Sequence, residues 1–99
     1  MRKIPPALRE EMSNDPFYKK CCLGGDGKIE WHHNLIYAGR QVNEKWCILP
    51  LSEGLHRIAD RKDIKEQLDT IMINRATPED LAKYPKVNWE QKKKWLGIK

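Results

Sequence analysis

The chain has 99 residues, of which 39% are hydrophobic and 33% are charged, and its formal net charge is +5. This length fits one domain with a small core, and four Trp, three Tyr and one Phe exclude a wholly disordered chain. No run approaches the roughly 18 apolar residues of a membrane span, and the opening MRKIPPALREEM lacks the apolar region of a signal peptide. The basic excess makes nucleic acid one candidate partner, although the same lysines also serve solubility.

The first half of the chain predicts one helix and two strands. Residues 5–14 form a helix that opens on two prolines, which suit a first turn. Three glycines and an aspartate at 24–27 indicate a turn, and the alternation in 28–31 (KIEW) is typical of a short strand. Residues 37–45 read as a loop. The apolar run 46–51 (WCILPL) predicts a buried strand, with Pro50 suited to an edge or an end.

The second half predicts helices only. Ser52 is the expected N-cap of a helix over 52–60. Apolar residues at helical spacing indicate a second helix over 63–73, and Thr77 with Pro78 marks the start of a third. Asn88 caps the last helix, which ends on a run of lysines.

The order of elements predicts an α+β fold with a β-β-α unit at its centre. We expect a single domain over 1–99, with a core over about 21–60 and helical flanks over 5–14 and 62–96.

The cysteines indicate a reducing compartment. Cys21 and Cys22 are neighbours that rarely bond each other, and the odd third residue, Cys47, suits no complete disulfide framework.

All three histidines of the chain lie in or beside the central unit. His32 and His33 end the first strand, and His56 lies on the helix that packs back across the hairpin. Two imidazoles on one cation would leave positions open for water and phosphate oxygens, while the third could accept a proton from the attacking water. The alternative is three ordinary histidines in a small basic protein.

The stretch "IEWHHN…WCILPLSEGLH" resembles the motif of HNH endonucleases, in the ββα-metal (His-Me finger) superfamily, and in particular small phage and prophage nucleases. The resemblance covers about 21–60. It implies that His32 and His56 are metal ligands and that His33 is the general base. Asp60, four residues after His56, is a weaker candidate for a third ligand, the alternative being a solvated carboxylate at the helix end.

Two positions depart from that family. The family's middle Asn, which braces the loop that carries the base, is replaced by Cys47, nine residues before His56. Asn34 and Asn43 are the residues that could compensate in this bracing. The Cys-x-x-Cys pairs of many relatives are also missing, so a four-cysteine zinc site is excluded. A degenerate site of Cys21 or Cys22 with Cys47 competes with free buried thiols.

The resemblance implies hydrolysis of DNA phosphodiester bonds with one divalent metal ion, Mg²⁺, Mn²⁺, Zn²⁺ or Ni²⁺. It further implies DNA as partner, with duplex DNA favoured and branched DNA, single-stranded DNA or RNA left open, no small-molecule cofactor, and a bacterial cytoplasm, with the chain encoded by phage or host. The lack of an apolar run long enough for a bilayer predicts no membrane partner.

Four basic residues flank the motif and are candidates for phosphate contacts, each with a solvated surface charge as its alternative: Arg40, Lys45, Arg57 and Arg61. Two other functions compete with the nuclease. One is a non-catalytic nucleic-acid-binding module with a degenerate HNH site, and the other is a structural zinc protein with His and Cys ligands.

Overall fold

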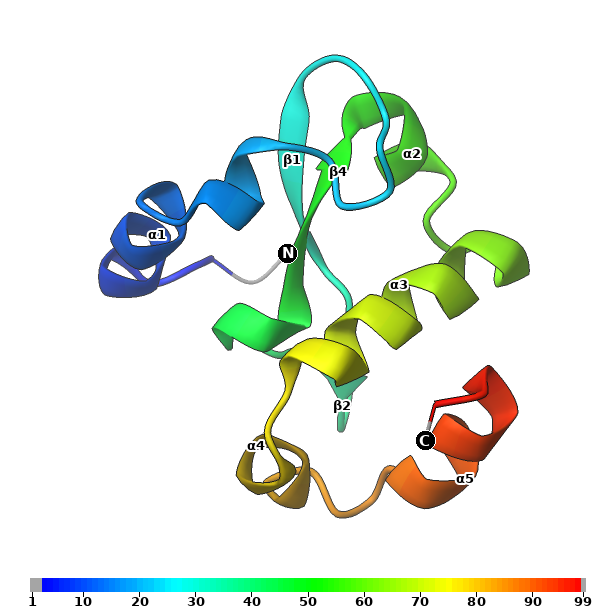
Figure 1. The fold of residues 1–99 in the computed structure, drawn as a ribbon. Coiled ribbons are helices and arrows are strands. Elements are labelled where there is room, and N and C mark those ends of the chain that lie inside the picture. Colours follow the sequence, from blue (N-terminus) through cyan, green and yellow to red (C-terminus); the bar gives the residue numbers. More distant parts are fainter. Residues whose placement is uncertain (1–2, 99) are drawn as a thin grey trace.

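The computed structural model describes residues 3–98 and confirms the α+β class. Two antiparallel strands, β1 (Ile29–His33) and β4 (Ile48–Ser52), form the central hairpin, and helix α2 (Glu53–Arg57) follows β4 directly (Figure 1). Opposite residues of the two strands run from Ile29 against Ser52 to His33 against Ile48. The β-β-α order predicted for the centre of the chain is therefore present.

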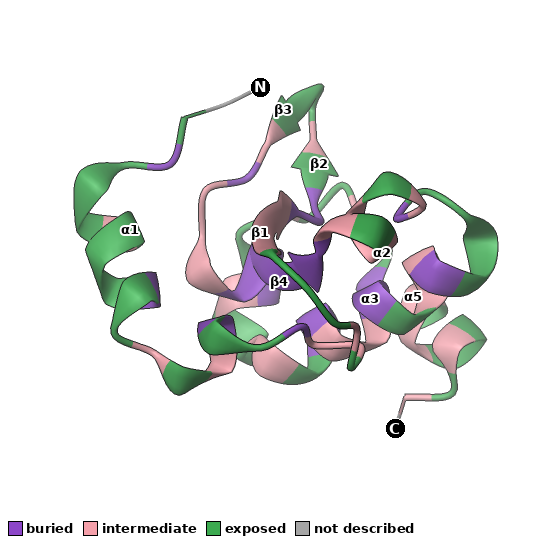
Figure 2. Cartoon of the chain, turned by 90° about the horizontal axis from the view of Figure 1, so that it is seen from above, coloured by how far each residue is buried: buried purple, intermediate pink, exposed green. Residues whose placement is uncertain are grey.

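The hairpin is covered by helices on both faces. Helix α1 (Pro6–Ser13) and the 3₁₀ turn η1 (Pro16–Lys19) lie on one side, and α3 (Lys62–Arg75), α4 (Pro78–Ala82) and α5 (Trp89–Leu96) lie on the other (Figure 1). β4 is buried along its whole length, as the prediction of a buried strand required, whereas α1 is mostly exposed (Figure 2).

The core is accordingly divided into two clusters. Ile48 packs with Ile4, Met12 and Tyr18 under α1. The larger cluster contains Leu49 and Leu51 from the opposite face of β4, together with buried residues of α3, α4 and α5: Ile64, Leu68, Met72, Ile73, Leu81 and Trp89. The flanking helices are therefore part of the core and not additions to it.

Helix starts follow the expected capping chemistry in most places. Thr77 and Asp80 form a reciprocal capping box at α4, and the Asn88 side chain accepts the N–H of Gln91 at α5. Ser52 occupies the N-cap position of α2, but its side chain makes no capping hydrogen bond.

The predicted loop 37–45 contains regular structure. Strands β2 (Ile36–Tyr37) and β3 (Arg40–Gln41) pair around a two-residue turn, and a 3₁₀ turn, η2 (Lys45–Cys47), precedes β4. Ala38 and Gly39 both have positive φ, 52° and 77°, as a type I′ hairpin turn requires. An alanine in this conformation is a poor turn signal, and for this reason the sequence reads as a loop.

Pro50 stands at the middle of β4 and not at its end. Its carbonyl accepts the N–H of Cys22 at 2.9 Å, so the backbone polar groups of Pro50 point away from β1. The missing N–H therefore falls on the outer edge of the hairpin, where it removes no bond to β1.

No helix in residues 3–98 combines the length and the apolar character needed to cross a membrane.

Candidate functional site

Strand β1 presents different residues on its two faces, since successive side chains of a strand alternate. Glu30 and His32 share the face of Leu49 and Leu51, which pack in the larger core cluster. His33 shares the other face with its strand partner Ile48, which packs under α1. The adjacent histidines consequently face different parts of the molecule.

His32 and His56 are brought together across β1 and α2. Their ring centroids are 5.1 Å apart with the planes at 74°, an edge-to-face arrangement. Nδ1 of His56 donates to the Glu30 carboxylate at 2.8 Å. With the Nδ1 proton held there, a neutral His56 carries its free lone pair on Nε2. The structure thus unites the two predicted metal ligands and adds a carboxylate that orients one of them.

The surroundings of His32 favour its neutral form. Burial lowers the pKa of His32 to about 4, and the nearby positive charges of His56 and Lys65 act in the same direction. The hydrogen bond to His56 lowers the pKa of the Glu30 carboxyl, which keeps it ionised. A neutral imidazole is the form that binds a metal ion.

His33 has its own partner on the other face. It is only 8% exposed, and its Nε2 donates to Oδ1 of Asn43 at 2.7 Å. The Asn43 amide nitrogen in turn donates to the carbonyl of Lys3 at 3.0 Å. Asn43 therefore orients the ring of His33, and in the neutral imidazole the lone pair lies on Nδ1.

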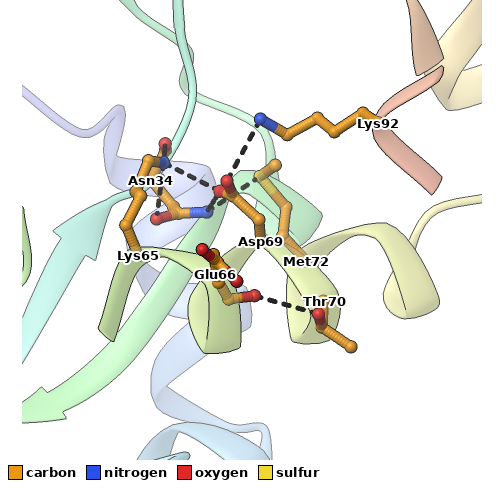
Figure 3. Close-up of polar contacts among 7 residues, drawn as sticks. All are labelled: Asn34, Lys65, Glu66, Asp69, Thr70, Met72 and Lys92. Atoms are coloured by element: carbon orange, nitrogen blue, oxygen red, sulfur yellow. Dashed lines mark hydrogen bonds and ion pairs between the residues drawn. The ribbon is translucent and has the colours of Figure 1, made fainter. Parts of the chain in front are cut away.

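Asn34, directly after His33, is the centre of a buried polar network (Figure 3). Its amide nitrogen donates to Oδ1 of Asp69 at 2.9 Å, and Lys65 Nζ donates to the Asn34 carbonyl at 2.8 Å and to its Oδ1 at 3.1 Å. Lys65 and Lys92 form ion pairs with the two carboxylate oxygens of Asp69, at 2.8 and 3.1 Å. The main chain that follows the predicted base is thus held from α3 and α5.

Cys47 takes part in this bracing through its backbone. The N–H of Asn34 donates to the Cys47 carbonyl at 2.8 Å, while the thiol is fully buried. Burial, and secondarily the charge of Glu44, raises the pKa of this thiol. Of the two asparagines named as able to compensate for Cys47, Asn43 bonds the imidazole of His33, and the side chain of Asn34 bonds Asp69 and Lys65.

Asp60 does not share a helix face with His56. Helix α2 ends at Arg57, and Asp60 lies exposed in the turn that follows. The helix predicted over 52–60 is therefore too long, because Ile58 N–H bonds to the Leu55 carbonyl in a tighter last turn. Asp60 therefore lies outside the helix that carries His56, and the i, i+4 relation of the two residues does not place it on the face of His56.

The basic residues named as candidates for phosphate contacts differ in their ion pairs and in their exposure. Lys45 forms ion pairs with Asp15 and Glu11, at 2.9 and 3.4 Å. Arg57 and Arg61 are exposed but paired with Glu53 and Asp63, at 2.7 and 3.3 Å. Arg40 lies exposed on β3, where it lines a 390 Å³ surface pocket with Asn43 and Tyr84.

The three cysteines form no disulfide, and Cys21 and Cys47 are buried whereas Cys22 is partly buried. Burial, followed by the charge of Cys21, raises the pKa of Cys22 to about 11. Among residues 3–98, no three or more His, Cys, Asp or Glu side chains are grouped so that they could hold a metal ion.

Three site residues were missed from the sequence. Glu30 could have been found, because it precedes His32 by two residues and so shares its strand face. Asp69 carries a weaker signal: it is an acidic residue beside Leu68 and Met72, on the buried stripe of a helix. Lys65 follows from Asp69, since residues four apart on a helix are neighbours.

Comparison of the chain with family models, with curated proteins and with solved structures finds no match.

Proposed function

We propose that this chain is a metal-dependent endonuclease that hydrolyses DNA phosphodiester bonds. The observation that carries the proposal is the meeting of His32 and His56, from the strand and the helix of a β-β-α unit, with Glu30 holding Nδ1 of His56. An imidazole that gives one N–H to a carboxylate is the usual form of a metal-binding histidine. The resemblance to the HNH motif supports the same roles.

The donor set fits a divalent cation with open positions. The surroundings of His32 favour its neutral form, and a neutral His56 whose Nδ1–H is held by Glu30 presents Nε2, so the chain can offer two nitrogen ligands. Nitrogen donors suit Zn²⁺, Ni²⁺ or Mn²⁺ better than Mg²⁺. When bound, the ion would supply Lewis-acid stabilisation of the charge that develops on the phosphate.

His33 serves as the general base in this proposal, which requires the phosphate to lie at the end of β1, because His32 and His33 leave opposite faces of the strand. Asn43 accepts its Nε2–H, so Nδ1 is the atom that would accept a proton from the attacking water. The Asn34 network holds the peptide behind it. A base oriented by one fixed hydrogen bond is the arrangement that general-base catalysis requires.

Plasmid nicking tests the proposal. Supercoiled plasmid is incubated with the wild type, with His33→Ala and with Asn74→Ala, an exposed control on α3. Each protein is assayed with Mg²⁺, with Mn²⁺, with Zn²⁺ and with EDTA. We expect nicking by the wild type and the control, none in EDTA, and a loss of at least about 100-fold in His33→Ala. Absence of nicking by folded wild type with every metal would contradict the proposal.

A second function is favoured by two observations. His33, the proposed base, is only 8% exposed, and its side chain leaves the strand face opposite to that of His32. Both suit a non-catalytic nucleic-acid-binding module built on the same fold. DNA binding that is unchanged by EDTA, with no cleavage under any metal, would select this second function.

A further inference from the structure

Trp95 is exposed on the last turn of α5. It is 70% exposed, and Ile36 at 64% is the one other large hydrophobic residue in positions 3–98 that is comparably open to solvent. The other three tryptophans are buried or partly buried against the core clusters. The indole of Trp95 is therefore accessible to a ligand.

Cations lie next to this indole. Lys62 Nζ, at the start of α3, is 5.6 Å from the centroid of the Trp95 ring. Lys92 precedes Trp95 by three residues, so its side chain leaves the same face of α5. Its ammonium directs one N–H at Asp69, 3.1 Å away, and remains partly exposed. Asp63, the residue after Lys62, is paired with Arg61. We call these three side chains the Lys62–Lys92–Trp95 surface.

This surface is joined to the candidate site by direct contacts. Lys92 contacts Asp69, and Asp69 contacts Asn34, which follows His33 (Figure 3). A ligand bound to this surface is therefore connected to Asn34, the residue after the proposed base, by two contacts, Lys92 to Asp69 and Asp69 to Asn34.

We propose that the Lys62–Lys92–Trp95 surface binds single-stranded nucleic acid, with an unpaired base stacked on Trp95 and phosphates near the two ammonium groups. A duplex covers the faces of its bases, whereas an unpaired base offers one to an aromatic ring. The net charge of +5 and the adjacent lysines favour a polyanion over an apolar protein partner. The inference deepens the proposed function, on which it rests, and it selects single-stranded nucleic acid among the substrate forms that the resemblance leaves open.

Binding without cleavage tests this inference. Fluorescein-labelled dT15 and a 15-base-pair duplex are titrated with wild type, Trp95→Ala, Trp95→Phe and Ile36→Ala, in EDTA and at about 50 mM salt. We expect Trp95→Ala to weaken binding of dT15 about tenfold and Trp95→Phe to keep most of the affinity. Ile36→Ala should bind as the wild type, and the duplex should respond less than dT15 to the loss of Trp95.

Inorganic polyphosphate separates stacking from charge, because it lacks bases. Trp95→Ala should bind polyphosphate as tightly as the wild type, whereas Lys62→Gln should weaken both ligands. Equal binding of dT15 by Trp95→Ala and wild type would overturn the inference, and so would equal losses for dT15 and polyphosphate. Thermal melting checks that each variant is folded.

Sedimentation velocity tests the remaining possible occupant of the surface, which is a second copy of the chain. If the wild type is a dimer that Trp95→Ala converts to a monomer, the surface is an interface between copies and the inference fails. All binding is measured in EDTA, so its result stands apart from plasmid nicking. A chain that binds dT15 through Trp95 but nicks nothing refutes only the nuclease.

Discussion

At the scale of single residues, His32 couples the site to the stability of the fold. Burial lowers its pKa to about 4, with a further contribution from His56, whereas an unfolded histidine titrates near 6.5. Between these values the unfolded chain binds the proton that the folded chain excludes. The contribution of His32 to the free energy of unfolding is therefore fully present above about pH 6.5 and is lost as the pH falls toward 4.

The free energy of unfolding should consequently be lower at pH 5 than at pH 7. We expect a loss of roughly 1–2 kcal/mol, reduced from the full linkage value because His32 is partly exposed. Urea denaturation at both pH values measures it. His32→Gln should show a smaller difference than the wild type, and an equal difference in both proteins would refute the assignment to His32. The Glu30 carboxyl does not contribute to the difference between pH 5 and pH 7, because the hydrogen bond to His56 lowers its pKa and it is protonated only at more acidic pH.

The residue scale also shows what the sequence could and could not predict about the site. The placement of His32 at the strand end and of His56 on the following helix predicted that their rings could meet, and the structure brings the two rings together. The partners of His33 and Asn34 could not be predicted, because Asn43 and Asp69 reach them through loops and helix packing that leave no periodic signal. The catalytic roles of these histidines stay predictions.

At the scale of elements, α3 supports the site through one buried carboxylate. Asp69 is only 5% exposed and receives two ammonium groups and one amide, from α3, α5 and the end of β1. A buried charge is tolerated when its partners are complete, and removing one partner leaves the others unpaired. Asp69 therefore ties three elements together that share no regular hydrogen bonds.

Asp69→Asn should destabilise the protein by about 1.5–3 kcal/mol, because Lys65 and Lys92 lose their shared counter-charge. Urea denaturation at pH 7 provides the measurement. Glu66→Gln, on the same helix and partly exposed, is the matched control and should change stability by less than about 0.5 kcal/mol. Equal stability of Asp69→Asn and wild type would show that the network contributes nothing to the fold.

Helices and strands differed in how well the sequence predicted them. The helices with marked starts, at Thr77 and Asn88, were predicted correctly because capping is a local interaction. The β2–β3 hairpin was missed because Ala38 adopts a positive φ that only the surrounding pairing enforces. The end of α2 was misplaced because its last turn tightens without any glycine or proline.

At the scale of the whole molecule, the central hairpin depends on both flanks. Its two faces pack in different clusters, one under α1 and one against α3, α4 and α5. An isolated two-stranded hairpin is only marginally stable in water, so residues 21–60 depend on the flanking helices for a stable fold.

A fragment spanning 21–60 should therefore be unfolded on its own. We expect the far-UV circular dichroism of a disordered chain and no cooperative thermal transition, whereas the full chain should melt cooperatively. A fragment spanning 16–98, which keeps the larger cluster, should retain helical signal but melt at lower temperature. Cooperative melting of the 21–60 fragment would show that the flanks are dispensable.

A two-stranded sheet has two open edges, and each can recruit a strand from another molecule. Pro50 places its missing N–H at the middle of the outer edge of β4, and its carbonyl is already bonded to Cys22. An incoming strand would find neither a donor nor a free acceptor at that point. The same proline that leaves the pairing with β1 intact thus protects this edge of the molecule against β-aggregation.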